Sequence, residues 1–163
     1  MNKMGINFDW KYTDRFDEKF IKSFPEHEVV HIPHTNKELP FNNLSEKDYQ
    51  FISSYEKIID VEKKKDKRYI LRFEAVMTYA EVFVNETLVG SHKGGYTPFK
   101  FDVTEHINKG ENKVFVKVDS TERKDIPPFG FVIDYLCYGG IYREVYLIEQ
   151  EANFIDQAHI STD

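Results

Sequence analysis

The chain has 163 residues, which suits one domain and is too short for the ~250 residues of a (β/α)₈ barrel. An apolar content of 40%, with 15% aromatic residues, can build a packed core and excludes a disordered chain. The formal net charge of −6 argues against a nucleic-acid-binding surface, which needs a clustered excess of lysine and arginine.

The first thirty residues contain the best helical pattern of the chain. Phe16, Phe20 and Phe24 recur every fourth residue, which would place them on one face of a helix. Thr13 or Asp14 is positioned to cap the start of this helix, and the proline after Phe24 ends it. We therefore expect a short N-terminal helical segment before the first strand.

Alternation of apolar and polar residues dominates the rest of the chain and predicts strands. We expect strands over residues 29–32, 51–61, 69–73, 79–84, 87–89, 99–103, 114–118 and 141–148, with a further start near 154. Asn85-Glu86 is a two-residue hairpin connection, and the lysine-rich stretch 63–68 is interpreted as a solvated hairpin turn. Short strands with a turn about every 10 residues are typical of a β-sandwich or jelly roll.

A longer segment, Ser120 to Gly139, shows no clear alternation. Loops of this length are uncommon in compact domains and often carry function. Residues 1–10 are mixed and polar, no apolar run approaches the ~18 residues of a membrane span, and the single Cys137 excludes an internal disulfide. These features predict a cytoplasmic domain that binds neither nucleic acid nor membrane.

Five segments in a fixed order carry more specific motifs. They are Val30–His34, Asp48–Lys57, Arg72–Phe99, Phe101–Asn112 and Gly139–Val145. Together they resemble the sugar-binding domain that opens family 2 glycoside hydrolases, the β-galactosidase and β-glucuronidase group. Two departures are Glu86, where the family more often has glycine, and Cys137-Tyr138, where its members vary.

The resemblance implies an all-β, jelly-roll sandwich of about eight strands, galactose-binding-domain-like, as a single domain over residues 1–163. It also implies a parent enzyme that is a retaining O-glycosyl hydrolase, with two carboxylates ~5–5.5 Å apart on a barrel that follows this domain. The family's catalytic motifs do not occur in this chain, so we expect no catalytic residue here and no activity from the chain alone.

The resemblance further implies substrate contacts in two loops. Asp134, six residues before Gly140, corresponds to an aspartate near the galactosyl hydroxyls and, in some members, near a sodium ion. Asn42 or Asn43 corresponds to an asparagine in the earlier loop, and Asn42 is preferred. Carboxylate oxygens suit both hydroxyls and hard cations. The competing interpretations are a loop-capping or ion-pairing role for Asp134 and an ordinary turn residue at Asn42.

The expected function is therefore to form one wall of a β-galactoside pocket and to pack on the downstream domains of the same chain. β-Glucuronidases and β-mannosidases share the architecture, so the sugar is left open. The alternatives are a free-standing carbohydrate-binding module and a purely structural domain. No metal site or cofactor is predicted in the chain itself, because His27, His31 and His34 lack a placed carboxylate or cysteine partner. Sodium or magnesium is expected only in the parent enzyme, and a homo-oligomer remains among the alternatives.

Overall fold

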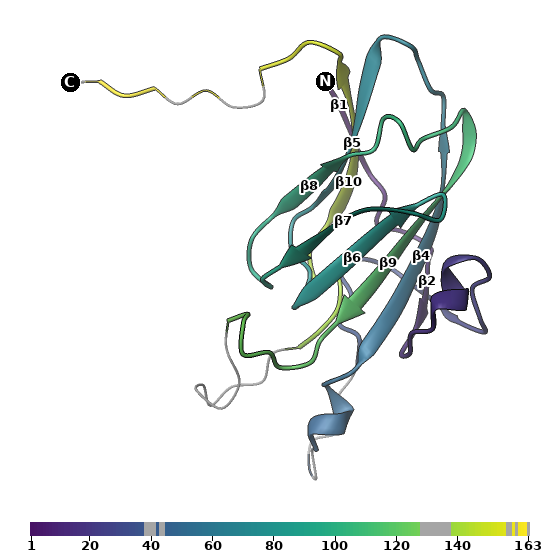
Figure 1. Cartoon of the computed structure of the whole chain (residues 1–163), viewed down its shortest axis with the longest axis vertical. Coiled ribbons are helices and arrows are strands. Elements are labelled where there is room, and N and C mark those ends of the chain that lie inside the picture. Colours follow the sequence, from purple (N-terminus) through teal and green to yellow (C-terminus); the bar gives the residue numbers. More distant parts are fainter. Residues whose placement is uncertain (38–41, 43–44, 128–137, 156–157, 159, 163) are drawn as a thin grey trace.

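The chain forms two antiparallel β-sheets that pack face to face (Figure 1). The computed structural model describes all residues except 38–41, 43–44, 128–137, 156–157, 159 and 163. The smaller sheet has the order β1 (Asn2–Gly5), β10 (Val145–Glu151), β5 (Lys67–Phe73), β8 (Phe99–Asp102). The larger sheet has the order β3 (Glu28–Val30), β2 (Trp10–Thr13), β4 (Ile52–Val61), β9 (Gly110–Asp119), β6 (Tyr79–Val84), β7 (Thr87–Lys93). The predicted all-β sandwich is confirmed.

The alternation that predicted the strands also decides which side chains form the core. In β9, Val114, Val116 and Val118 are fully buried and belong to the apolar cluster between the sheets. Leu71 of β5 joins this cluster from the opposite sheet. Tyr55 joins it from β4, the neighbour of β9 in the larger sheet. Because successive side chains of a strand point to opposite faces, this inward set leaves Phe115 on the outside of the larger sheet.

The outer face of the larger sheet is covered by the segment for which a helix was predicted. Phe16 and Phe24 pack against Phe115, with ring centroids 6.3 and 6.1 Å away, so Phe115 is only 1% exposed. The helix itself is wrong: the segment contains one 3₁₀ turn, η1 (Glu18–Ile21), capped by Asp17 rather than by Thr13 or Asp14. The spacing of the phenylalanines reflects a shared contact with the sheet and needs no continuous helix.

Strands β1 and β2 were missed by the sequence reasoning. Each has four residues, and each is held by a partner far along the chain. β1 pairs with β10, and β2 lies between β3 and β4. Trp10 of β2 is fully buried, and its indole N–H donates a 2.6 Å hydrogen bond to the carbonyl of Ile6.

Two of the predicted turns have different outcomes. Asn85 and Glu86 have φ values of 48° and 70°, the left-handed pair of a two-residue hairpin, and they connect β6 to β7 as predicted. The stretch 63–68 is not a hairpin, because β4 and β5 belong to different sheets and the chain crosses between them there. The strand start expected near Phe154 is also wrong, since that residue lies in irregular structure after β10.

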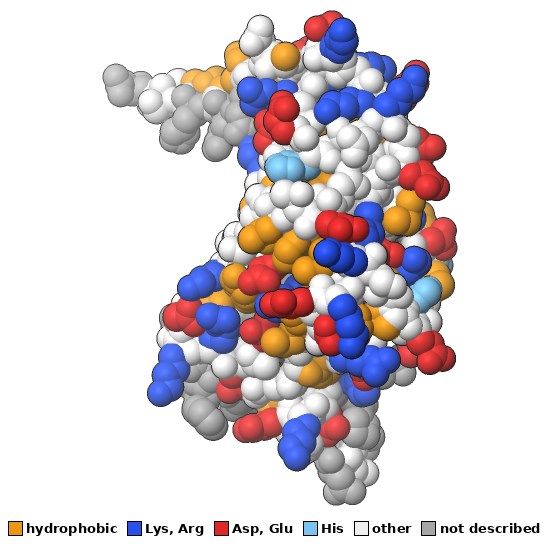
Figure 2. Space-filling model, turned by 45° about the vertical axis from the view of Figure 1, so that its right-hand side comes forward, with side chains coloured by type: hydrophobic (Ala, Val, Ile, Leu, Met, Phe, Trp, Pro, Cys, Tyr) orange, Lys and Arg blue, Asp and Glu red, His pale blue; other side chains and the backbone are white. Residues whose placement is uncertain are grey.

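The surface carries charges of both signs. On the face shown in Figure 2, acidic and basic side chains are interspersed with small apolar areas. Cross-strand ion pairs also join strands of the larger sheet, including Lys117–Glu81 at 3.0 Å and, with a buried carboxylate, Lys11–Glu56 at 2.7 Å. Within the described ranges, no helix is long and apolar enough to cross a membrane.

Candidate functional site

The Gly139-Gly140 motif lies at one end of the sandwich, where four chain segments meet. A Cβ atom on Gly139 would come within 2.0 Å of Ser120 Oγ and 2.5 Å of Asn36 Nδ2. A Cβ atom on Gly140, whose φ is +118°, would meet the carbonyl oxygen of His34 at 2.5 Å. The two glycines are therefore required by close approach of the backbone to its neighbours.

Hydrogen bonds join these four segments. The side-chain amide of Asn36 donates to Ser120 Oγ at 2.7 Å, and its backbone N–H donates to the carbonyl of Gly139 at 2.9 Å. The backbone N–H of Ser120 donates to the carbonyl of Phe51 at 3.1 Å. Next to it, the N–H of Glu122 donates to Oε1 of Gln50 at 3.1 Å. We refer to this set, His34–Asn36, Gln50–Phe51, Ser120–Glu122 and Gly139–Ile141, as the loop base.

The loop base is also held to the connection between β5 and β6. Gly140 and Met77, which lies in that connection, exchange two backbone hydrogen bonds of 3.0 and 3.2 Å. Within the loop base, the N–H of His34 donates to the carbonyl of Ile141 at 2.9 Å. Two segments, 37–49 and 123–138, thus begin and end at the same place. In Figure 1, this place is at the lower end of the sandwich, near η2 (Glu46–Asp48), far from the labelled termini.

A group of ion pairs holds residues 123–125, which directly follow Ser120–Glu122 of the loop base. Asp125 accepts hydrogen bonds from Arg123 Nε at 3.1 Å and from Lys93 Nζ at 2.7 Å. These two cations, Arg123 first, hold the pKa of Asp125 well below its usual range. Arg123 also lies over the ring of Tyr79, 5.1 Å from its centroid. The group is exposed, so salt weakens it.

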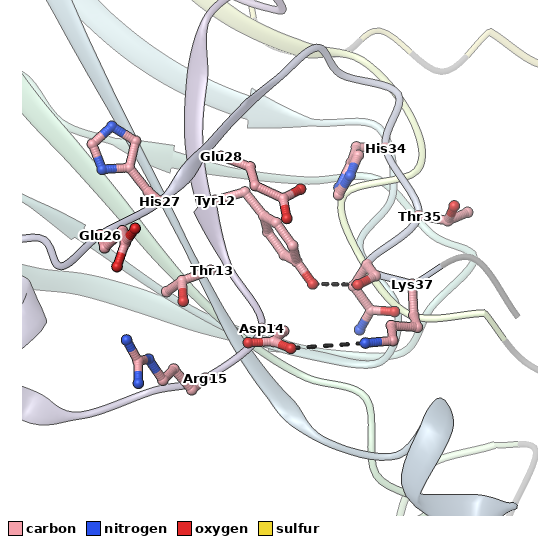
Figure 3. A pocket seen from close by; sticks show the side chains of 11 residues that line it. Tyr12, Thr13, Asp14, Arg15, Glu26, His27, Glu28, His34, Thr35 and Lys37 are labelled. Carbon is pink, nitrogen blue, oxygen red and sulfur yellow. Dashed lines mark hydrogen bonds and ion pairs between the residues drawn. The ribbon is translucent and has the colours of Figure 1, made fainter.

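A polar cleft of about 590 Å³ opens beside the loop base (Figure 3). Its wall comes from the end of β2, the start of β3 and the segment 34–37. Figure 3 shows Glu28 above the Tyr12 ring and beside His34, with the Asp14–Lys37 ion pair, 3.8 Å long, on the opposite side. The cleft therefore offers hydrogen-bond donors and acceptors of both charges.

Two rings of the cleft wall, Tyr12 and His34, rest on a third ring, Tyr55, in the core. Tyr12 lies 4.7 Å from His34 and 4.9 Å from Tyr55, measured between ring centroids, and its hydroxyl donates to the carbonyl oxygen of Asn36. Burial, followed by the nearby carboxylates of Asp14 and Glu28, raises the pKa of Tyr12. Tyr12 therefore stays protonated and remains a hydrogen-bond donor at neutral pH.

The neighbouring titratable groups are shifted mainly by burial. Burial raises the pKa of Tyr55 well above its ordinary value, with a smaller contribution from Tyr12. Burial lowers the pKa of His34, and the carboxylate of Glu28 opposes this effect only partly. His34 is therefore a neutral imidazole at neutral pH, held by a 2.9 Å hydrogen bond between Nδ1 and the Tyr55 hydroxyl.

The predicted contact residues are only partly placed. Asn42 is exposed in an irregular stretch, whereas Asn43 and Asp134 lie outside the described residues, as does Cys137. Sequence reasoning missed Asn36 and Ser120, the two buried polar residues that connect the segments. The sequence pointed to these residues only indirectly, through the Pro33-His34 motif before Asn36 and the Gly139-Gly140 motif that packs against both.

The fold and this site define a class of protein: an antiparallel β-sandwich in which two long connecting segments, 37–49 and 123–138, are anchored at one end. Comparison with known proteins makes the assignment specific. The profile described as "Glycosyl hydrolases family 2, sugar binding domain" matches residues 20–151. The chain belongs to this family and contains its sugar-binding domain.

Individual relatives agree with the family assignment. The chain is 47% identical over 150 residues to a β-galactosidase of Thermoanaerobacter pseudethanolicus, covering 88% of this chain and 20% of that protein. It is 45% identical over 162 residues to a β-galactosidase of Thermoanaerobacterium thermosulfurigenes, covering 96% and 23%. The structure of an uncultured Clostridium sp. β-glucuronidase superposes with a TM-score of 0.79 at 29% identity, covering 90% of this chain and 28% of that one. The chain thus spans about a fifth of the length of these curated relatives.

Proposed function

We propose that this chain is a domain of a β-galactosidase, in which it forms one wall of the galactoside pocket and packs on the catalytic domain. The two relatives with 47% and 45% identity, over 88% and 96% of the chain, are β-galactosidases, whereas a β-glucuronidase of Bacteroides fragilis is 42% identical over only 60% of the chain. A β-glucuronide is the second candidate substrate, supported by the likeness of the uncultured Clostridium sp. β-glucuronidase structure over 90% of the chain. The comparisons give no support to a free-standing carbohydrate-binding module.

One observation carries the proposal of a pocket wall. The segments that contain Asn42 and Asp134 begin and end at the shared loop base, although these residues are far apart in the sequence. Functional residues of β-sandwiches often lie on loops gathered at one end of a rigid scaffold. Together with the family membership, this arrangement supports a sugar contact at that end.

We assign Asp134 as the main galactosyl contact and Asn42 as the second, with Asn43 as its alternative. A carboxylate accepts hydrogen bonds from sugar hydroxyls through both oxygens, and a side-chain amide both donates and accepts. A sodium ion beside Asp134, or magnesium elsewhere in the complete enzyme, remains part of the proposal. Residue 134 lies outside the described part of the chain, so the fit of a cation there rests on ligand chemistry alone.

The experiment compares two proteins on two substrates. The complete enzyme and the 163-residue chain are each assayed with an aryl β-galactoside and an aryl β-glucuronide. We expect the complete enzyme to prefer the galactoside and the chain alone to be inactive, because the carboxylate pair of a retaining glycosidase lies in another domain. Preference for the glucuronide would overturn the substrate, and turnover by the chain alone would overturn the role as a pocket wall.

A substitution in the complete enzyme tests the assigned contact. Asp134→Ala removes charge-assisted hydrogen bonds worth ~1.5–3 kcal/mol each, which corresponds to a loss of kcat/KM of roughly ten- to a few-hundred-fold. Asp134→Asn is expected to be milder if hydrogen bonding dominates and nearly as harmful if the charge holds a cation. Unchanged kinetics with a lower melting temperature would assign Asp134 a structural role.

A further inference from the structure

Asn36 forms hydrogen bonds at both ends of segment 123–138. Its side chain, in a residue only 3% exposed, donates to Ser120 Oγ, and its backbone N–H donates to the carbonyl of Gly139. Its own carbonyl accepts the hydroxyl of Tyr12 from strand β2. Segment 37–49 starts at the next residue. Asn36 therefore connects the start of one segment to the start and the end of the other.

The space around Asn36 leaves little room for another arrangement. Gly139 packs so closely that even a Cβ atom would collide with Nδ2 of Asn36 and with Ser120 Oγ. Truncating Asn36 to alanine would leave Ser120 without this donor and open a gap against Gly139. A buried polar group that loses its partner costs free energy, so the two chain ends would shift to relieve the loss.

We infer that Asn36 is a positioning residue for sugar binding, acting through the 2.7 Å hydrogen bond to Ser120. This inference rests on the proposed function, because it assigns a catalytic consequence to the geometry of the loop base. Asn36 does not touch the sugar. It sets where segments 37–49 and 123–138 leave the sandwich, and a misplacement of ~1 Å at a binding group is enough to lower a rate substantially.

The test uses Asn36→Ala, Ser120→Ala and the double variant in the complete enzyme. Hydrolysis of an aryl β-galactoside is measured well below the melting temperature of every variant. We expect each single variant to lose about tenfold or more in kcat/KM, and the double variant to lose little more, because both single changes break the same hydrogen bond. Ser120→Ala removes only one oxygen atom and keeps the test valid should Asn36→Ala fail to fold.

Asn112→Ala is the matched control. Asn112 is 1% exposed and bonds to Asn108 and Asn85 through its side chain, like Asn36 in kind, but it lies at the other end of β9 from Ser120. We expect it to lower the melting temperature while kcat/KM stays within about twofold of the wild type. If Asn36→Ala and Ser120→Ala behave like this control, their role is only structural and the inference is overturned.

A second readout separates failure of the inference from failure of the proposed function. Hydrogen–deuterium exchange of the complete enzyme reports the backbone N–H groups of Asn36, Ser120 and Gly140 directly. We expect Asn36→Ala to increase exchange at these positions and to leave the Asn85–Asn112 end unchanged. If the wild-type enzyme cleaves neither glycoside, the proposed function is wrong. If the enzyme is active but Asn36→Ala does not change the exchange at these positions, the positioning role of Asn36 is overturned.

Discussion

The hydroxyl of Tyr55 lies 2.9 Å from Nδ1 of His34, and the two rings meet edge to face with centroids 5.7 Å apart. Tyr55 is fully buried, so one side of the His34 imidazole is held against the core, and His34 is half-buried in the cleft wall. The carboxylate of Glu28 faces the same ring but does not outweigh burial. Protonation of His34 would therefore place a charge in a poorly solvated site.

This pair predicts a loss of stability in mild acid. Since burial lowers the pKa of His34, the unfolded chain takes up its proton at a higher pH than the folded chain. The free energy of unfolding is then lost as the pH falls below about 6.5, toward the lower pKa of the folded state. His92, whose pKa burial also lowers, adds to the same effect.

Urea unfolding at several values between about pH 7 and pH 5 measures this dependence. His34→Gln should weaken the dependence, because it removes one of the groups that gain a proton on unfolding. An identical slope for His34→Gln and the wild type would contradict the prediction.

Gly139→Ala should be strongly destabilising. The added Cβ atom would overlap Ser120 Oγ at 2.0 Å, and overpacking of this kind typically costs about 1–3 kcal/mol. Gly5→Ala is the matched control, because its nearest neighbour, Asn7 Nδ2, lies at 3.2 Å and needs to move by only a few tenths of an ångström. Thermal unfolding of both variants checks the prediction, which is wrong if the two melting temperatures fall equally.

Phe115→Ala should cost about 3–5 kcal/mol, the range for a buried aromatic residue, although Phe115 points away from the main core. The cost comes from its contacts with Phe16, Phe24 and the cross-strand Phe83, whose ring centroid lies 5.8 Å away, and these leave Phe115 1% exposed. Leu88→Ala, at a residue 53% exposed, should change stability by less than about 0.5 kcal/mol. A small effect of Phe115→Ala in urea unfolding would show that segment 16–24 does not cover the sheet in solution.

Glu86→Gly should stabilise the domain slightly. Glu86 has φ +70°, a region that costs a residue with a Cβ atom about 1–2 kcal/mol and costs glycine nothing. The greater freedom of glycine in the unfolded chain and loss of the exposed Lys113–Glu86 pair offset part of this gain. We expect a net gain of about 0.5 kcal/mol in urea unfolding, and a loss of stability would contradict the argument.

The sequence was informative where structure depends on near neighbours. The alternation of Val114, Val116 and Val118 marks a strand because its period is a property of the strand itself. The Asn85-Glu86 turn is likewise local, since two residues of the left-handed region close the hairpin. The helix predicted over residues 16–24 was wrong, because phenylalanines spaced by four residues occur both in a helix and in an irregular segment that packs on a sheet.

The loop base was not predictable in the same way. Asn36 and Ser120 are 84 positions apart, and neither belongs to a pattern that reveals its partner. The glycines at 139 and 140 belong to a recognisable motif, but only the folded arrangement shows that Asn36 and Ser120 pack against Gly139. Strands β1 and β2 were missed for a related reason, since their identity depends on β10 and β4 rather than on their own four residues.

The pairing of β1 with β10 also affects how the domain is made on the ribosome. Lys3 lies opposite Ile148, so the first strand has no partner in this sheet until almost the whole domain has been synthesised. Until then, the apolar residues of the early strands are exposed to solvent and to other nascent chains. Pairing between distant residues also slows folding, because closure of a long loop comes before the contacts that stabilise it. Late completion of this sheet is therefore a consequence of the topology.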